Sequence, residues 1–177
     1  MDAQRSDFSK TNLGDANLTR ARFDSSDFTN SDMKSSVLTQ TGLYRANMTG
    51  ADVSYSEFDR TNIREVNLTG ANLTGSVFTN VNSMHVKFDG ADLTGIVLLQ
   101  SGFDRTTFKD ADLTGVNLSG NNLSGSQFVG AKQTDWTLWP SSISPSSLEV
   151  EQREMRNPDL ICDLTSINDC SGADLNH

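Results

Sequence analysis

The chain has 177 residues, of which 35% are hydrophobic and 21% are charged, and its formal net charge is −9 at pH 7. This length allows one domain with a substantial core. No stretch approaches the roughly 18 apolar residues of a membrane span, so we expect no transmembrane helix. The sequence pI of about 4.5 disfavours direct binding to nucleic acid. The first residues show no charged and apolar leader, which leaves localisation open because a targeting segment can be removed.

A five-residue repeat runs through the first 130 residues. Every fifth residue from Phe8 to Phe128 is large and apolar, with Ser83 as the one exception in 25 positions. The residue two places earlier is small, with Ile96 and Asn121 as the main departures. The residue between these two is Asp or Asn in 15 of the 25 repeats. Each repeat therefore holds a small residue, a polar residue and a large apolar residue, followed by two variable residues.

A period of five fits neither the 3.6-residue period of a helix nor the two-residue period of a long strand. A short extended triplet does fit, because its first and third residues point the same way while the second faces water. The last two residues of each pentad must then turn the chain. Nine of the 13 glycines occupy the fifth position, where a type II turn requires a positive φ.

The repeat resembles that of the pentapeptide-repeat family, whose signature is A(D/N)LxX. Typical triplets are Ala16-Asn17-Leu18, Ala51-Asp52-Val53 and Ala91-Asp92-Leu93. The resemblance covers residues 6 to about 131. It implies an all-β solenoid, a right-handed quadrilateral β-helix with four pentads per coil and about six coils. We expect this β-helix at residues 5–135, and a capping segment with one or two short helices at residues 136–177.

Four pentads per coil place residues 20 apart above one another. This register predicts a stack of Phe88, Phe108 and Phe128, and a second stack of Phe58 and Phe78. Seven of the nine fifth-position glycines then fall on two of the four corners. They are Gly50, Gly70, Gly90 and Gly130 on one corner, and Gly75, Gly95 and Gly115 on the next. We interpret this segregation as a difference in turn type between corners.

An aromatic cluster follows the last regular repeat. Trp136, Leu138, Trp139 and Pro140 form this cluster, which we expect to cover the open end of the coil. Ser144-Pro145 offers an N-cap followed by proline at the first helical position, which predicts a helix as far as Arg156. Asn157-Pro158 ends that helix. A second short helix is expected from Pro158 and carries Leu160, Ile161 and Leu164.

Two cysteines, Cys162 and Cys170, lie in the C-terminal segment. In one unbroken helix they would be about 12 Å apart along the axis, but a turn at residues 166–169 brings them within reach of each other. We favour a disulfide over two free thiols. A disulfide favours the periplasm or the thylakoid lumen over the cytoplasm. The segment resembles that of lumenal pentapeptide-repeat proteins of plants and cyanobacteria, in which C-terminal helices close the β-helix.

The sequence contains no recognisable catalytic motif. His85 and His177 are the only histidines, and there is no glycine-rich phosphate loop, Gly-x-Ser-x-Gly or His-Glu-x-x-His. No four-ligand metal spacing exists either. We therefore expect no enzymatic activity, no cofactor, no metal and no small-molecule substrate.

One corner of the expected coil departs from the repeat in composition and is a candidate interaction edge. It combines aromatic, sulfur-containing and charged side chains, of kinds that are enriched at protein interfaces. Its members are Tyr44, Arg45, Arg64, Glu65, Met84, His85 and Arg105. The alternative is tolerated variation at an exposed turn.

A candidate apolar patch is formed by Val77, Val97 and Leu99, which are expected to face outward. Val37 shares the column of the two valines, but Glu57 interrupts it. Such a patch is typical of a protein interface, so we expect a monomer or a weak dimer.

Two functions fit these observations. The first is a non-catalytic scaffold or protein-interaction module with an unidentified protein partner. The second follows from another branch of the family, whose members mimic DNA and bind DNA gyrase or topoisomerase, as in quinolone resistance. A mimic needs a strongly negative rod. Residues 1–135 hold 16 acidic and 12 basic side chains, which weakens this second hypothesis but leaves a single anionic face as an open alternative.

Overall fold

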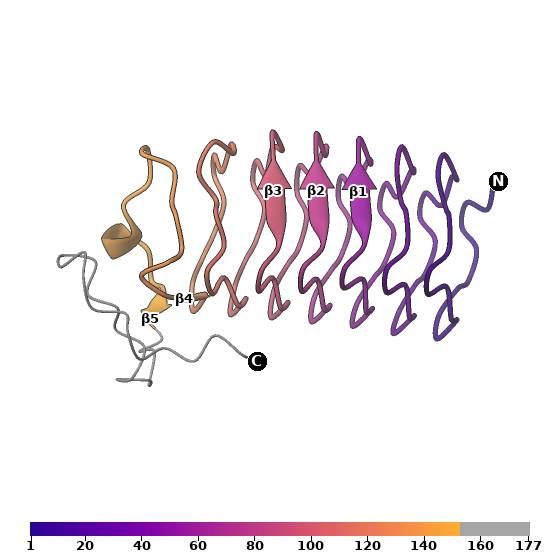
Figure 1. The fold of residues 1–177 in the computed structure, drawn as a ribbon, viewed down its shortest axis with the longest axis horizontal. Coiled ribbons are helices and arrows are strands. Elements are labelled where there is room, and N and C mark those ends of the chain that lie inside the picture. Colours follow the sequence, from indigo (N-terminus) through magenta and orange to yellow (C-terminus); the bar gives the residue numbers. More distant parts are fainter. Residues whose placement is uncertain (153–177) are drawn as a thin grey trace, which may run out of the picture.

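Residues 1–152, the part of the chain that the computed structural model describes, wind into a β-helix (Figure 1). Most rungs are joined by single parallel bridges, because each extended segment is only a triplet long. The named elements are β1 (Glu57–Asp59), β2 (Val77–Thr79), β3 (Val97–Leu99), β4 (Lys132–Gln133), a 3₁₀ turn (Pro145–Ser147) and β5 (Glu151–Gln152). β1, β2 and β3 form one parallel sheet, and β4 pairs with β5.

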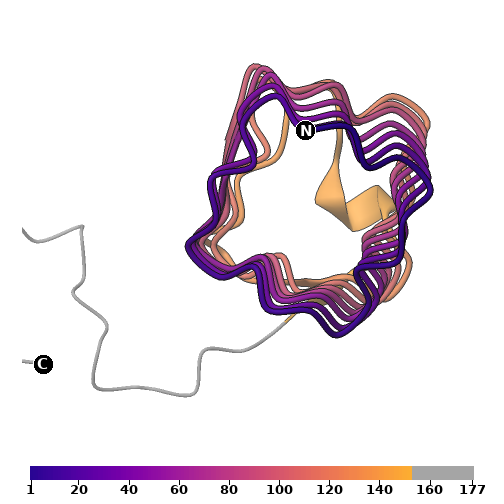
Figure 2. The same ribbon diagram turned by 90° about the vertical axis from the view of Figure 1, so that its right-hand side faces the viewer.

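The coil repeats every 20 residues. Phe58 of β1 lies opposite Phe78 of β2, and parallel bridges with the same spacing run from Asp2 with Arg22 onward. This register confirms four pentads per coil. Figure 2 shows the resulting four-sided outline along the axis of the coil. Within residues 1–152, no helix is long and apolar enough to cross a membrane.

The small and the large residue of each triplet point into the coil, as the repeat predicts. Phe23, Phe58 and Phe78 expose no surface. Where the small residue is Ser or Thr, its hydroxyl often donates a hydrogen bond to the carbonyl of a large residue in the preceding coil. The Ser56 Oγ lies 2.8 Å from the Met33 carbonyl oxygen in this way. A buried hydroxyl with such a partner avoids the cost of an unpaired polar group.

The Asp or Asn between them has a structural role that the repeat did not indicate. Its side-chain oxygen accepts a hydrogen bond from the backbone N–H two residues later. The distance is 3.1 Å from Thr19 to Asn17 and 3.0 Å from Ser54 to Asp52. Asp and Asn favour turns for this reason, so these residues hold the corner in place as well as facing water.

From Arg5 to Gly130, every corner of the coil has the same left-handed backbone at its second residue. All 26 such residues from Arg5 to Gly130 have a positive φ, and 17 of them are not glycine. Our interpretation that turn type differs between corners is therefore wrong. The backbone N–H of Lys10 donates to the Thr29 carbonyl at 2.9 Å, and equivalent bonds recur around the coil. These bonds help to offset the left-handed conformation, which costs roughly 1–2 kcal/mol per residue.

The predicted phenylalanine stack is present along one side of the core. The rings of Phe88 and Phe108 are 5.2 Å apart at an angle of 12°, and those of Phe108 and Phe128 are 4.9 Å apart at 3°. Phe58 and Phe78 are also adjacent, with centroids 4.3 Å apart, but their rings are tilted by 41°.

Ser83, the exception among the large core residues, is completely buried. Val81 and Val86 occupy the small-residue positions on either side of it and are also buried. The Ser83 hydroxyl donates to the Gly102 carbonyl. The core therefore keeps its apolar volume through two larger neighbours, while the serine satisfies its own polar group.

The C-terminal end of the coil contains one extra residue. Asn117 pairs with Leu138 instead of residue 137, so pairing continues past residue 135. The ring of Trp139 packs edge-on against Phe128 at 5.0 Å and covers part of the end. Trp136 and Leu138 are instead 61% and 51% exposed. The expectation that the whole aromatic cluster covers the end is wrong for these two residues, because the extra residue turns them outward.

The helix predicted from Pro145 is also wrong within the described residues. Only a 3₁₀ turn forms, and the Ser144 side chain makes no capping hydrogen bond. The chain then extends into β5, where the Glu151 N–H donates to the Ala131 carbonyl at 2.8 Å. The last coil offers unpaired backbone groups that an extended strand can use and a helix cannot. The predicted second helix, Cys162 and Cys170 lie outside the described residues.

We expect Phe108→Ala to lower the free energy of unfolding by about 3–5 kcal/mol, because it removes the middle ring of a buried stack. Urea denaturation measures this change. Val129→Ala, at a side chain that is 47% exposed, is the control and should change the value by less than about 0.5 kcal/mol. Equal losses in the two variants would contradict the packing described above.

Candidate functional site

The charge of the β-helix is concentrated on one of its four sides. Each side presents the middle residue of its triplets and the two corner residues that follow. One side has six acidic and two basic residues, which gives it a net charge of −4. The charged residues of this side are Asp15, Asp32, Asp52, Asp92, Asp112, Asp135, Lys34 and Lys132. The other three sides have balances of +1, −1 and 0. This anionic side therefore accounts for the whole excess of acidic residues in the coil.

The candidate interaction edge forms a continuous row on another corner. Backbone hydrogen bonds between successive coils place its residues in register. The N–H of Arg45 donates to the Arg64 carbonyl at 3.0 Å, and that of Glu65 donates to the Met84 carbonyl at 2.9 Å. The backbone N–H of His85 donates to the carbonyl of Asp104, the neighbour of Arg105, so the row continues to Arg105. The structure thus brings together all seven residues that the sequence assigned to this edge.

Three residues of the edge bind one another. The Arg45 Nε lies 2.7 Å from a carboxylate oxygen of Glu65. The Tyr44 hydroxyl donates to the other oxygen of Glu65 at 3.3 Å, and the Arg45 guanidinium lies 4.8 Å from the centre of the Tyr44 ring. Such contacts fix the orientation of exposed side chains but contribute little stability. Tyr44, Arg45 and Glu65 therefore form an ordered cluster.

The remaining members of the edge differ from this cluster in their exposure and in their ion pairs. Arg64 is exposed and takes part in none of the ion pairs found among residues 1–152. Arg105 lies 3.6 Å from its neighbour Asp104, and His85 is exposed. Met84 is half-buried. This part of the edge therefore places exposed cationic groups beside a thioether.

The Arg45 hydrogen bond lowers the pKa of Glu65 below its usual value, and the charge of Arg45, the Tyr44 hydroxyl and His85 act in the same direction, whereas burial opposes them. The same contact raises the pKa of Arg45. Because the folded state binds the Glu65 proton less tightly, the pair stabilises the fold at neutral pH. That contribution is lost as the pH falls through the pKa of Glu65 in the folded state.

The candidate apolar patch lies on β2 and β3. Val77 is opposite Val97, and Leu99 is opposite Thr79. Val97 and Leu99 are 42% and 51% exposed, whereas Val77 is half-buried. The three predicted residues are therefore adjacent and outward-facing.

Sequence reasoning missed three further members of this surface. Tyr55 is 60% exposed, and Trp136 and Leu138 are exposed to a similar extent. The pairing of Leu138 with Asn117 puts it in the same column as Val97. The extra residue near position 135 shifts the repeat by one place, so the five-residue period alone could not assign Trp136 and Leu138 to this surface.

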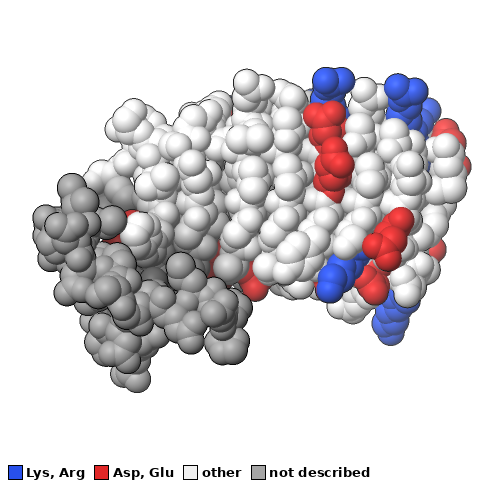
Figure 3. Space-filling view, in the orientation of Figure 1, with Lys and Arg blue, Asp and Glu red and all other residues white. Residues whose placement is uncertain are grey.

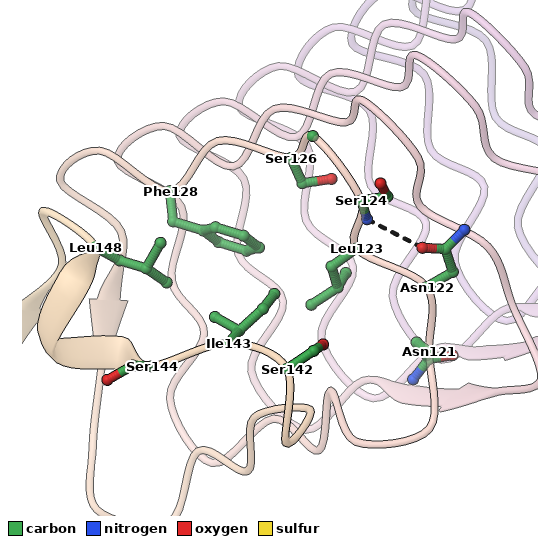
Figure 4. Close-up of a pocket in the computed structure, with 11 residues that line it drawn as sticks. Asn121, Asn122, Leu123, Ser124, Ser126, Phe128, Ser142, Ile143, Ser144 and Leu148 are labelled. Atoms are coloured by element: carbon green, nitrogen blue, oxygen red, sulfur yellow. Dashed lines mark hydrogen bonds between the residues drawn. The ribbon is translucent and has the colours of Figure 1, made fainter.

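A hollow of about 540 Å³ lies at the C-terminal end, between the last coil and residues 142–148 (Figure 4). The side chains of Leu123, Phe128 and Ile143 line it together with asparagine and serine side chains. Among residues 1–152, no charged side chain lines this hollow. In residues 1–152, no group of three His, Cys, Asp or Glu side chains is arranged to hold a metal ion.

The fold defines a class, the β-helical repeat proteins, in which stacked units share one core. The profile described as pentapeptide repeats matches eight copies in this chain, at residues 4–40, 43–80, 84–120 and 101–132. The chain therefore belongs to the pentapeptide-repeat family. No curated protein gives a significant match to it.

The chain is similar to several solved structures at low sequence identity. A pentapeptide repeat protein from the Arabidopsis thaliana thylakoid lumen is 23% identical over 60% of this chain and 67% of its own, with a TM-score of 0.41. HetL, a regulator of heterocyst differentiation from the cyanobacterium Nostoc, is 18% identical over 78% and 90%, with a TM-score of 0.37. The fluoroquinolone resistance protein QnrB1 is 17% identical over 87% and 83%, with a TM-score of 0.44.

We expect Arg45→Gln to raise the pKa of Glu65 toward its usual value, because the main group that favours the ionised carboxylate is lost. A pH titration followed by NMR of the Glu65 carboxyl carbon measures this shift. Arg64→Gln removes a neighbouring positive charge that makes no ion pair with Glu65 and serves as the control. An unchanged titration in Arg45→Gln would show that the ion pair does not persist in solution.

Proposed function

We propose that this protein is a non-catalytic scaffold that binds a protein partner through the edge from Tyr44 to Arg105. The observation that carries the proposal is the contrast in charge between this edge and the rest of the chain. Five arginines and four acidic residues lie on the side that contains the edge, whereas the chain as a whole has a net charge of −9. The partner is expected to present acidic side chains around an apolar contact for Met84.

Two features of the edge support this role. The ordered cluster of Tyr44, Arg45 and Glu65 holds its aromatic and cationic groups in place before binding, which reduces the entropy lost on association. Arg64 leaves its guanidinium available for a bidentate contact with a carboxylate. A rigid coil behind the edge keeps these groups at fixed spacing.

Charge reversal at Arg64 and Arg105 tests the proposal. We expect Arg64→Glu with Arg105→Glu to reduce recovery of the partner at least tenfold in quantitative affinity purification from cells of the source organism. Arg20→Glu with Arg60→Glu makes the same change of charge on another corner and should leave recovery unchanged. If both double variants recover the same proteins in the same amounts, the edge is not the binding surface.

The anionic side favours a second candidate, a DNA mimic that binds gyrase or topoisomerase. Asp32 and Asp52 occupy successive rungs, as do Asp92 and Asp112, so carboxylates follow one another at the strand spacing of about 4.8 Å. The other three sides are nearly neutral, however, and a cationic DNA-binding groove contacts more than one side of a duplex. We therefore prefer the scaffold.

A supercoiling assay with purified DNA gyrase separates the two candidates. The scaffold hypothesis predicts no inhibition and no protection from quinolones at protein concentrations up to about 10 µM. The mimic predicts an effect that weakens steeply with added salt. In that case Asp52→Asn with Asp92→Asn should reduce the effect, while Asp27→Asn with Asp89→Asn, on a neighbouring side, should not.

A further inference from the structure

A large part of one side of the β-helix carries no charge. Residues 74–80, 94–100 and 114–120 contain no Lys, Arg, Asp or Glu. They follow one another as three successive turns of the same side, which includes β2 and β3. Figure 3 shows a broad area free of charged side chains over these two strands. Charges return at β1, where Glu57 and Asp59 face outward.

Exposed apolar side chains gather on this uncharged area and at its borders. Seven large hydrophobic side chains are exposed among residues 1–152, and five of them lie here. Together with half-buried Val77 they define the apolar face: Tyr55, Val77, Val97, Leu99, Trp136 and Leu138. Exposed apolar side chains gathered in this way, on an otherwise polar surface, are typical of an interface.

The corner beside this face carries no side chain in three successive coils. Gly75, Gly95 and Gly115 occupy it in three successive coils. Their positive φ does not require glycine, since 17 other corners have the same conformation with a side chain. A Cβ at Gly115 would have no neighbour within 4 Å, whereas one at Gly75 would lie 2.7 Å from the Tyr55 ring. Gly75 therefore makes room for the Tyr55 ring, whereas Gly95 and Gly115 leave their part of the corner open to close approach by another molecule.

We propose that two copies of this chain associate through the apolar face. Each copy has a net charge of −9, so contact between charged surfaces is opposed by repulsion. On the uncharged turns this repulsion and the cost of desolvating ions are both smallest. A second copy is thus the occupant that fits these uncharged turns, at whose border the Lys34 ammonium lies 5.7 Å from the centre of the Tyr55 ring.

The arrangement of the aromatic residues suits a two-fold axis. Tyr55 and Trp136 lie at the same corner, two coils on either side of Gly95. A two-fold axis through the uncharged turns, at the level of Gly95 along the rod, places the coil of Tyr55 in one copy at the level of Trp136 in the other, twice. Such an interface is isologous, since the same residues of both copies meet. Aromatic pairs add about 0.5–1.5 kcal/mol beyond the burial of their area.

The size of the apolar face indicates weak association. From Tyr55 to Trp136 it spans four coils, about 19 Å along the rod at the usual strand spacing, and its six side chains are far fewer than the roughly 20–30 residues that each partner contributes to a standard interface. We expect a dissociation constant on the order of 10–1,000 µM. The candidate interaction edge is half a coil away from the glycine corner and stays exposed, so the dimer would present two such edges. The pairing itself does not depend on the function proposed above.

Sedimentation equilibrium of the full chain, up to about 1 mM, tests the proposal. The double variant Val97→Glu, Leu99→Asp places carboxylates on β3 at the positions that Glu57 and Asp59 occupy in β1. The fold accommodates carboxylates at these positions in β1, so the double variant should fold. We expect the wild type to associate and this variant to bind at least tenfold more weakly. Val129→Glu, at a large exposed apolar residue on another side, is the matched control and should associate like the wild type.

A wild-type chain that remains monomeric throughout this range would overturn the proposal, as would a double variant that associates unchanged. Circular dichroism checks that the double variant is folded, and Val97→Glu alone replaces it if it is not. Salt provides a second readout, because association through an uncharged face between two anionic copies should strengthen when salt screens their repulsion. Association that weakens with salt would instead indicate ion pairing and contradict the assignment.

Discussion

The parallel hydrogen-bond ladder between residues 20 apart is the constraint on which the whole structure depends. It sets the four-pentad coil, and it stacks the buried rings of Phe88, Phe108 and Phe128. It also sustains left-handed corners at residues such as Arg45, whose backbone N–H is bonded to the next coil. A triplet has little stability alone, so the ladder and the shared core must form together.

Since the ladder fixes what is inside the coil, only the outward residues are free to encode function. They are distributed unevenly. The anionic side, the uncharged turns of β2 and β3 that follow it around the glycine corner, and the arginine-rich edge occupy successive parts of the circumference. Under the scaffold function that we propose, this arrangement lets different surfaces engage different partners without competing.

The two candidate surfaces were predictable to different degrees. The edge from Tyr44 to Arg105 follows directly from the register, because residues 20 apart must be neighbours. Its internal cluster was not predictable, since the contact of Arg45 with both Glu65 and Tyr44 depends on side-chain orientation. The apolar face was recovered only around Val77, Val97 and Leu99.

The sequence by itself determined the repeat and the inward and outward positions, because both follow from a local pattern repeated 25 times, and the 20-residue register followed from the resemblance to the family. Only the tertiary structure decided features that depend on the neighbouring coil. Non-glycine corners adopt a positive φ because the ladder compensates for it. The segment after Pro145 forms β5 and not a helix because the last coil has backbone groups to pair. Trp136 faces solvent because one extra residue shifts the register at that point.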